Sequence, residues 1–125
     1  MKPFVRDWAT LPAQVMRPGV TRVGVGTTEV SVQIATLRRD MTLNPHQHPY
    51  EQIALILSGE GFAYLGDQRF AIGPRSLITI PSNVRHYIEV TSEEPMVNID
   101  VFAPARADLA ELFAWMETEE PVHYE

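Results

Sequence analysis

The sequence predicts an all-β fold followed by a C-terminal helix. Short runs rich in β-branched and aromatic residues recur along most of the chain, and residues that favour turns separate them. Many short strands at close spacing are typical of a sandwich or a barrel. Beyond residue 104 this alternation stops, and apolar residues recur with helical spacing. A chain of 125 residues is enough for one core, so we expect a single domain over residues 1–125.

The expected strands form a barrel core over about residues 20–103. Turn signals such as Gly59 and Gly66 mark the connections between them. We expect strands at residues 20–27, 28–38, 53–58, 62–65, 70–72, 76–81, 87–90 and 96–102.

The C-terminal segment predicts an α-helix over about residues 105–120. Pro104 precedes this segment and Pro121 ends it. Four apolar residues recur at i, i+3, i+4 and i+7, which places them in one stripe. These residues are Leu109, Leu112, Phe113 and Met116. The stripe packs either on the outside of its own barrel, or over a dimer partner or the cavity mouth.

Three of the four histidines, together with one glutamine, predict a metal site. His46 and His48 are two residues apart, which puts both imidazoles on one face of an extended segment. Gln52 stands at the start of an apolar run, and His86 follows 34 positions later at the head of another. Three imidazoles and one amide oxygen suit a divalent transition metal such as Ni, Mn, Fe, Zn or Co, with positions left open for a substrate.

Glu51 is the alternative to Gln52 as the fourth ligand, and a carboxylate is the stronger ligand of the two. Residues 51 and 52 point to opposite faces of an extended segment. Gln52 then shares the inward face with Ala54 and Ile56, so we favour Gln52. A different interpretation treats the histidines as surface residues or as hydrogen-bonded core residues without a metal.

This arrangement resembles the two sequence motifs of the cupin family. The residues that match those motifs are His46, His48, Gln52, Gly59, Pro81 and His86. Three turn positions depart from the family glycine, with Asp40, Arg75 and Asn83 in its place. Asparagine and aspartate tolerate positive φ, whereas arginine does so less readily. The resemblance implies a double-stranded β-helix, the jelly-roll barrel of the cupins, with the metal inside.

The expected strand at residues 96–102 carries the candidate base. Asn98, Asp100 and Phe102 share one face of this strand. The opposite face consists of Val97, Ile99 and Val101. In one interpretation the aliphatic face fills the core and Asp100 is solvated. In the other, Asp100 faces a cavity beside the metal and acts as a base.

The segment from Asp100 to Arg106, combined with the histidine set, resembles the small cupins of the KdgF type. Those proteins convert 4,5-unsaturated uronates, released by pectin and alginate lyases, into linear keto sugars. The resemblance implies that Asp100, Phe102 and Arg106 line the site. Asp100 is then expected to take a proton, Arg106 to bind the uronate carboxylate, and Phe102 to shape the wall.

Other functions compete with this ring-opening isomerase. A cupin dioxygenase usually has a carboxylate ligand, which Gln52 does not provide. A polyketide cyclase of the cupin type is a further enzymatic alternative. A non-catalytic cupin that binds a sugar or an acid would keep the metal without needing an ionised, inward-facing Asp100.

Composition limits the partners and the compartment. A net charge of −6 argues against nucleic acid and anionic membranes as partners. The resemblance to the uronate-converting cupins implies a small anionic molecule, a sugar acid, as the ligand. The sequence contains no cysteine, so disulfides and thiol chemistry are excluded. No stretch has the length of a membrane span, and we expect a cytoplasmic protein. The apolar faces exceed what one small barrel covers, so we expect a homodimer.

Overall fold

The computed structural model describes residues 3–118, which form two antiparallel sheets followed by short helical segments. The strands are β1 (Gln14–Arg17), β2 (Val20–Gly26), β3 (Ser31–Leu37), β4 (Gln52–Ser58), β5 (Gly61–Leu65), β6 (Gln68–Ile72), β7 (Leu77–Ile80), β8 (His86–Val90) and β9 (Met96–Phe102). The helical segments are η1 (Trp8–Thr10), η2 (Ala107–Leu109), α1 (Ala110–Phe113) and α2 (Trp115–Thr118). The all-β prediction is confirmed, and each expected strand is present.

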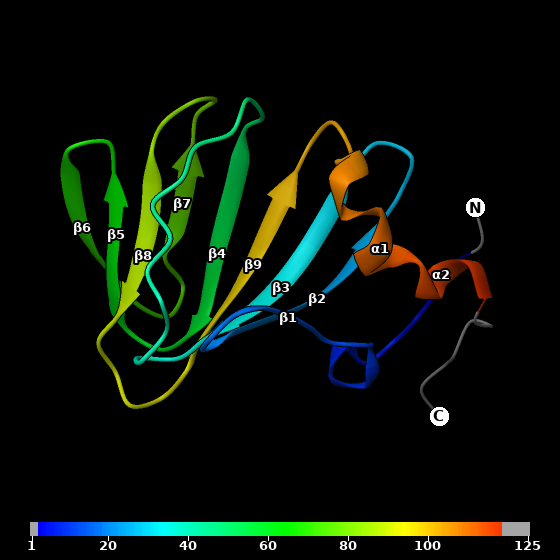
Figure 1. The fold of residues 1–125 in the computed structure, drawn as a ribbon, viewed down its shortest axis with the longest axis horizontal. Helices are drawn as coiled ribbons and strands as arrows, with labels where there is room; N and C mark the ends of the chain where they lie inside the picture. Colours follow the sequence, from blue (N-terminus) through cyan, green and yellow to red (C-terminus); the bar gives the residue numbers. More distant parts are fainter. Residues whose placement is uncertain (1–2, 119–125) are drawn as a thin grey trace.

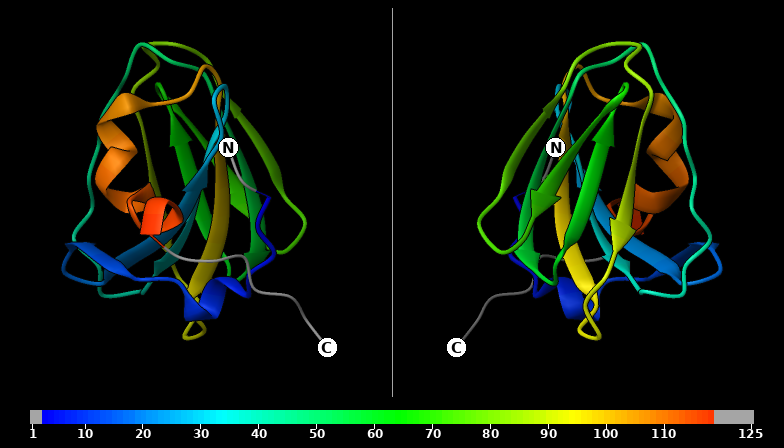
Figure 2. Two further views of the ribbon diagram at one scale, coloured as in Figure 1. Left: turned by 90° about the vertical axis from the view of Figure 1, so that its right-hand side faces the viewer. Right: turned by 90° about the vertical axis from the view of Figure 1, so that its left-hand side faces the viewer.

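The larger sheet has six strands in the order β1-β2-β3-β9-β4-β7, and the smaller has three in the order β6-β5-β8. Figures 1 and 2 show the two sheets on opposite sides of the barrel. Strand β9, from the end of the barrel sequence, lies between β3 and β4. This insertion brings side chains from three distant parts of the sequence onto one inward face.

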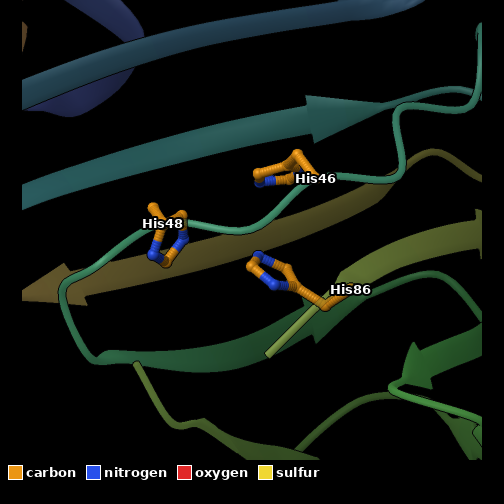
Figure 3. A group of neighbouring side chains, drawn as sticks. All are labelled: His46, His48 and His86. Carbon is orange, nitrogen blue, oxygen red and sulfur yellow. The ribbon is translucent and has the colours of Figure 1, made fainter. Parts of the chain in front are cut away.

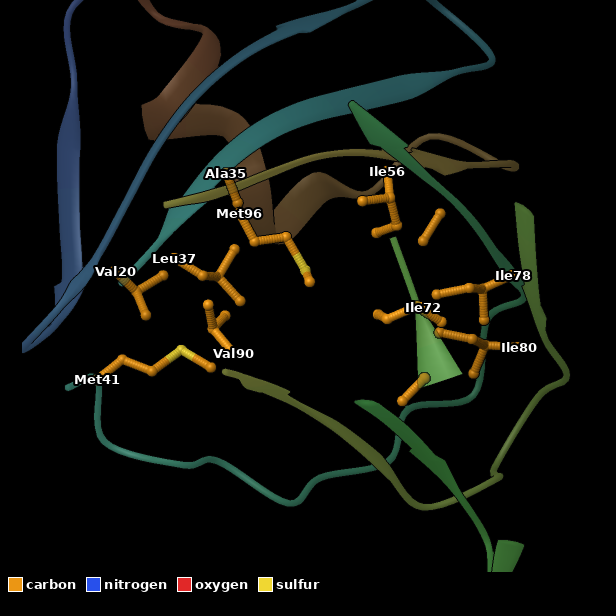
Figure 4. Packing of buried hydrophobic residues seen from close by; sticks show 12 residues of the cluster. Val20, Ala35, Leu37, Met41, Ile56, Ile72, Ile78, Ile80, Val90 and Met96 are labelled. Atoms are coloured by element: carbon orange, nitrogen blue, oxygen red, sulfur yellow. The ribbon is translucent and has the colours of Figure 1, made fainter. Parts of the chain in front are cut away.

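Alternation of side chains places the core between the sheets. In β3 and β9 every second residue is buried and those between are half-buried, as the period of two requires. The buried cluster draws on both sheets, with Ala35, Ile56 and Met96 from the larger one and Ile72 and Val90 from the smaller one (Figure 4). Burying each large aliphatic side chain contributes about 1.5–3 kcal/mol.

The turn positions that depart from the family glycine behave as turns. Arg75 has φ of 74° and Asn83 has φ of 63°, both in the left-handed region that glycine favours. Asp40 lies in a turn without positive φ. At Gly59, φ is +81° and an added Cβ would stand 2.5 Å from the Cα of Met96, so this position requires glycine.

The predicted C-terminal helix is confirmed as a short helical region within the described residues. The segment is divided into η2, α1 and α2, and residues beyond 118 lie outside the described part of the chain. The buried side chains Leu109, Leu112 and Trp115 recur every three residues. That spacing matches the tighter 3₁₀ turn better than an α-helix, and no side chain caps η2 or α1.

The helical segments pack on the chain's own sheet. An added Cβ at Gly24 would stand 2.6 Å from a methyl group of Leu112, and the indole N–H of Trp115 donates to the Gly24 carbonyl at 2.9 Å. Gly24 shares its face of β2 with Arg22, because residues alternate sides along a strand. The helix therefore covers one end of the inward face, a position that sequence alone left open.

Two N-terminal elements, β1 and η1, were not predicted. Val15 in β1 is exposed, and this edge strand lacks the alternating pattern that marks the others. None of the helical segments within residues 3–118 has the length and apolarity that a membrane crossing requires.

Candidate metal centre and its cavity

Backbone pairing brings the distant histidines together. His46 and His86 form an isolated antiparallel bridge, with His46 N–H donating to the His86 carbonyl at 3.1 Å and the reverse bond at 2.8 Å. His48 follows two residues later on the same extended segment. Figure 3 shows the three rings turned toward one another, and one nitrogen from each lies within 4.8 Å of the other two.

Each imidazole is oriented by a backbone carbonyl two residues away. The Nδ1 atoms lie 2.6 Å from the Asn44 oxygen for His46, 2.9 Å from the Tyr50 oxygen for His48 and 2.8 Å from the Val84 oxygen for His86. A carbonyl only accepts, so in the neutral ring Nδ1 is the nitrogen that carries the proton and Nε2 is the one with a lone pair. Such a carbonyl partner is the usual arrangement behind a metal-binding histidine.

His86 provides a second sign of a metal. Its Nε2 is buried and has no hydrogen-bond partner among the described residues. Burial lowers the pKa of the His86 imidazole, the bond to the Val84 carbonyl opposes this, and His46 and His48 lower it further. A neutral imidazole with an unused, inward lone pair fits a divalent transition metal ion.

Gln52 lies beside this cluster, and Glu51 is exposed. The Gln52 Oε1 atom is 3.0 Å from His48 Nε2. Both atoms are acceptors when the imidazole carries its proton on Nδ1, so a cation bound to both would satisfy them. The structure therefore brings Gln52, not Glu51, to the histidines, and it places Ala54 and Ile56 inward as predicted.

Asp100 faces the interior and not the solvent. Only 4% of it is exposed, and Gln33 and Gln52 donate to its two carboxylate oxygens at 2.8 and 2.7 Å. Burial raises the pKa of the Asp100 carboxyl, while hydrogen bonds from Gln33, Gln52 and Asn98 and the charge of Arg106 lower it; the net direction is upward. Asp100 therefore faces the cavity, as one of the two interpretations of the sequence expects, and it is not a solvated edge residue.

Arg106 lies over two aromatic rings at the cavity wall. Its guanidinium carbon is 4.2 Å from the Tyr50 ring centre and 4.5 Å from the Phe102 ring centre. Its Nε and Nη2 donate to Asp108 at 3.1 and 2.5 Å. The Arg106 hydrogen bond lowers the pKa of the Asp108 carboxyl below its usual value. Phe102 is fully buried, and its ring packs edge-on against His48.

These side chains line one cavity of about 290 Å³. That is near the lower end of the ~300–1,000 Å³ common for small-molecule sites. Arg17, Arg22 and Arg106 line it, whereas Asp100 is the one acid among its described lining residues. Positive charge therefore gathers in the cavity of a chain whose net charge is −6, which favours an anionic ligand.

Sequence reasoning missed Gln33, Arg22 and Tyr50. Gln33 is a buried amide on a face of β3 that otherwise carries small and apolar residues, and that contrast was a usable signal. Arg22 is positioned by Gln14 and Gln33, which accept from it at 2.7 and 3.1 Å. Tyr50 stacks on His48 at 4.3 Å between ring centres, and nothing in its spacing indicates this.

Comparison with known proteins identifies the family and agrees with the fold. The model of the cupin domain family matches residues 35–102. The chain belongs to the cupin family. Among curated proteins, this cupin is 35% identical over 82 residues to an acireductone dioxygenase from Bacillus cytotoxicus, covering 58% of the chain and 48% of the dioxygenase. The chain spans about half the length of the curated relatives that it matches.

Solved structures show the same cupin fold. KdgF from a Halomonas species superposes with a TM-score of 0.77 at 24% identity, covering 87% of this cupin and 99% of KdgF. An RmlC-like cupin from Shewanella frigidimarina gives a TM-score of 0.76 at 18% identity, covering 87% and 96%. At these identities the likeness concerns the fold, and KdgF is one of several neighbours.

Proposed function

We propose that this cupin is a metal-dependent enzyme that opens the ring of unsaturated uronate sugars and converts them to linear keto sugars. The observation that carries the proposal is the buried carboxylate of Asp100, one hydrogen bond from Gln52 in a cavity otherwise lined by cations and neutral groups. This arrangement offers a base next to a binding site for an anion.

A divalent ion held by the three histidines and Gln52 would supply Lewis acidity toward the oxygens of an anionic sugar. The ligand set is neutral, so the full charge of the ion would remain available to that anion. The chain itself supplies the proton acceptor. Gln33 and Gln52 each donate an amide N–H to one oxygen of Asp100 and Asn98 adds a third hydrogen bond, which leaves about one of its four lone-pair sites free.

The reaction requires one proton to move. Asp100 takes the proton of the anomeric hydroxyl group, C1 becomes a carbonyl, and the bond between C1 and the ring oxygen breaks. The ring oxygen is left as the enolate of the C4–C5 double bond. The proton held by Asp100 then goes to C4 and the 5-keto sugar results. Product and substrate are isomers, so no oxidant takes part. Burial raises the pKa of Asp100 toward the range in which a carboxylate accepts a proton more readily.

Arg106 binds the uronate carboxylate in this proposal. Its guanidinium lies at the cavity wall, fixed by the faces of Tyr50 and Phe102. Asn98 Oδ1 is a buried acceptor in the same wall with no partner among the described residues, which suits a sugar hydroxyl group. Phe102 shapes the wall between the histidines and Arg106.

The test is a direct assay of metal-loaded protein against a panel of 4,5-unsaturated uronates. Turnover removes the conjugated double bond, so its ultraviolet absorbance falls. Protein with one bound metal that leaves every uronate of the panel unchanged would refute the substrate class. The metal centre itself would be judged separately, by metal content.

A cupin dioxygenase is the second candidate, because the acireductone dioxygenase relative is 35% identical over the matched segment. Gln52 in place of a carboxylate ligand weighs against it. Oxygen consumption by the metal-loaded protein would distinguish the two enzymes, since ring opening consumes none.

We also propose that the protein is a homodimer. Ile53, Leu57 and Leu77 on adjacent strands β4 and β7 are exposed by 47, 44 and 74% on the outer face of the larger sheet. Half-buried Val97 and Ile99 continue this face on β9. An extended apolar face of this kind is unusual on a monomer, and a second copy of the chain would cover it.

A further inference from the structure

We infer that Asp100 is a positioning residue for the metal centre, because its carboxylate holds the amide of Gln52 with Oε1 toward the three histidines. The inference concerns metal binding alone and does not depend on the proposed substrate. It adds Gln33 and Arg22 to the residues on which the centre depends.

A continuous series of hydrogen bonds connects these residues. Arg22 Nη1 donates to Gln33 Oε1 at 3.1 Å, and Gln33 Nε2 donates to Asp100 Oδ2 at 2.8 Å. From the other side, Gln52 Nε2 donates to Asp100 Oδ1 at 2.7 Å. Gln52 Oε1 then faces His48 Nε2 at 3.0 Å.

The direction of every bond in the series is fixed by its two ends. A guanidinium only donates, so Gln33 must turn its oxygen to Arg22 and its NH₂ to Asp100. A metal binds only lone pairs, so Gln52 must turn its oxygen to the histidines and its NH₂ to Asp100. Two donors therefore converge on residue 100, which has to accept on both oxygens.

A carboxyl group, with an acceptor oxygen on each side, meets that requirement at this position. An asparagine would offer one acceptor and one donor. Because Arg22 fixes Gln33, the asparagine oxygen would turn to Gln33 and its NH₂ to Gln52. The Gln52 amide would then rotate to present its NH₂ to the histidines, and the fourth ligand would be lost.

Burial and strand register make the series rigid. Gln33 and Asp100 are only 8 and 4% exposed, so water has little access to replace either partner. They stand directly opposite each other in the β3–β9 ladder, and β4 carries Gln52 along the other side of β9. An amide held in this way keeps one orientation without a metal, which pre-organises the centre.

The experiment measures the affinity of purified protein for Co²⁺ by competition with a chromogenic chelator, in the absence of any sugar. Asp100→Asn should weaken binding by about 10- to 100-fold, the usual cost of removing a group that orients a ligand. Gln52→Ala should weaken it to a similar degree. Asp108→Asn is the matched control, because it removes a carboxylate outside the series, and its affinity should match the wild type.

The double variant decides between positioning and simple attraction of the cation by a nearby charge. If Asp100 acts through Gln52, the double variant Asp100→Asn with Gln52→Ala binds Co²⁺ no more weakly than Gln52→Ala alone. The visible spectra of Co²⁺ in Asp100→Asn and Gln52→Ala should also agree with each other and differ from the wild type. Losses that multiply in the double variant, or a wild-type affinity in Asp100→Asn, would overturn the inference.

Gln33→Met provides a second route if Asp100→Asn does not fold. It removes the amide that fixes one side of Asp100 and keeps the length of the side chain. A severalfold loss of Co²⁺ affinity is expected, and an unchanged affinity would overturn the inference as well.

Discussion

Replacing Arg106 by methionine should raise KM for an unsaturated uronate much more than it lowers kcat. Methionine keeps an apolar stem against Tyr50 and Phe102 but removes the charge above their rings. The carboxylate of the substrate would lose its cationic partner in both the ground state and the transition state. A loss of binding free energy that is equal in these two states raises KM and leaves kcat unchanged.

The structure sets the size of the effect. Two of the three guanidinium nitrogens of Arg106 donate to Asp108, and these are the only hydrogen bonds that the guanidinium makes to the described residues. One nitrogen thus remains for the ligand, and a hydrogen bond between charged groups contributes about 1.5–3 kcal/mol. At about 1.4 kcal/mol per factor of ten, the expected rise in KM is roughly 10- to 100-fold. The Arg106 side chain is only 13% exposed, so solvent screens this interaction weakly.

The assay is the loss of ultraviolet absorbance at several uronate concentrations, with each variant saturated by metal. Arg106→Lys keeps the charge without the planar fork, so its KM should fall between those of the wild type and Arg106→Met. Asp108→Asn frees the guanidinium and should not raise KM. An Arg106→Met protein with unchanged KM and a reduced kcat would show that Arg106 acts on the chemical step and not in binding.

Four further outcomes are expected. Asp100→Asn should lose about 10²–10⁴-fold in kcat, because an amide cannot take the hydroxyl proton. This rate is measured at saturating metal, so that weaker metal binding does not contribute. A wild-type rate would exclude Asp100 as the base. His46→Ala should abolish both metal content and the rise in melting temperature that metal gives the wild type, since a ligand stabilises only the state that binds it. The melting temperature of metal-free protein should fall as pH drops below about 6.5. Burial lowers the pKa of His86, so the unfolded chain takes up its proton at a higher pH than the folded chain does, and the stability present above that pH is lost. His86→Gln should flatten this dependence. Sedimentation should show a dimer at micromolar concentration, and Ile53→Arg should convert it to a monomer; a wild-type monomer would contradict the proposed interface.

Local patterns were enough to predict strands β2 to β9 and one face of the site. The period of two predicted that Asn98, Asp100 and Phe102 share a face, and all three are buried. It left open whether that face meets solvent or the cavity, because an isolated strand does not show what covers it. The histidine spacing predicted the cluster, since the pattern itself specifies the ligands.

Pairing between distant strands could not be predicted in the same way. Gln33 stands opposite Asp100 because β9 inserts beside β3, although the two residues are 67 positions apart. Neither residue carries a local signal of the other. The packing of the C-terminal helical segments could not be predicted for the same reason, because Trp115 donates to the Gly24 carbonyl across 91 positions.

In the proposed metal site, the hydrogen bond between positions 52 and 100 accounts for an amide as the fourth ligand. A glutamate at position 52 would set a second carboxylate at about the same 2.7 Å from Asp100. Two carboxylates at that distance do not both stay ionised, so one would take up a proton and either the ligand or the base would be lost. Glutamine avoids this conflict because its oxygen faces the histidines while its NH₂ donates to Asp100. In the proposed mechanism the negative charge of Asp100 thereby stays one hydrogen bond away from the ligand set, where it would orient the ligand and still accept a proton from a sugar.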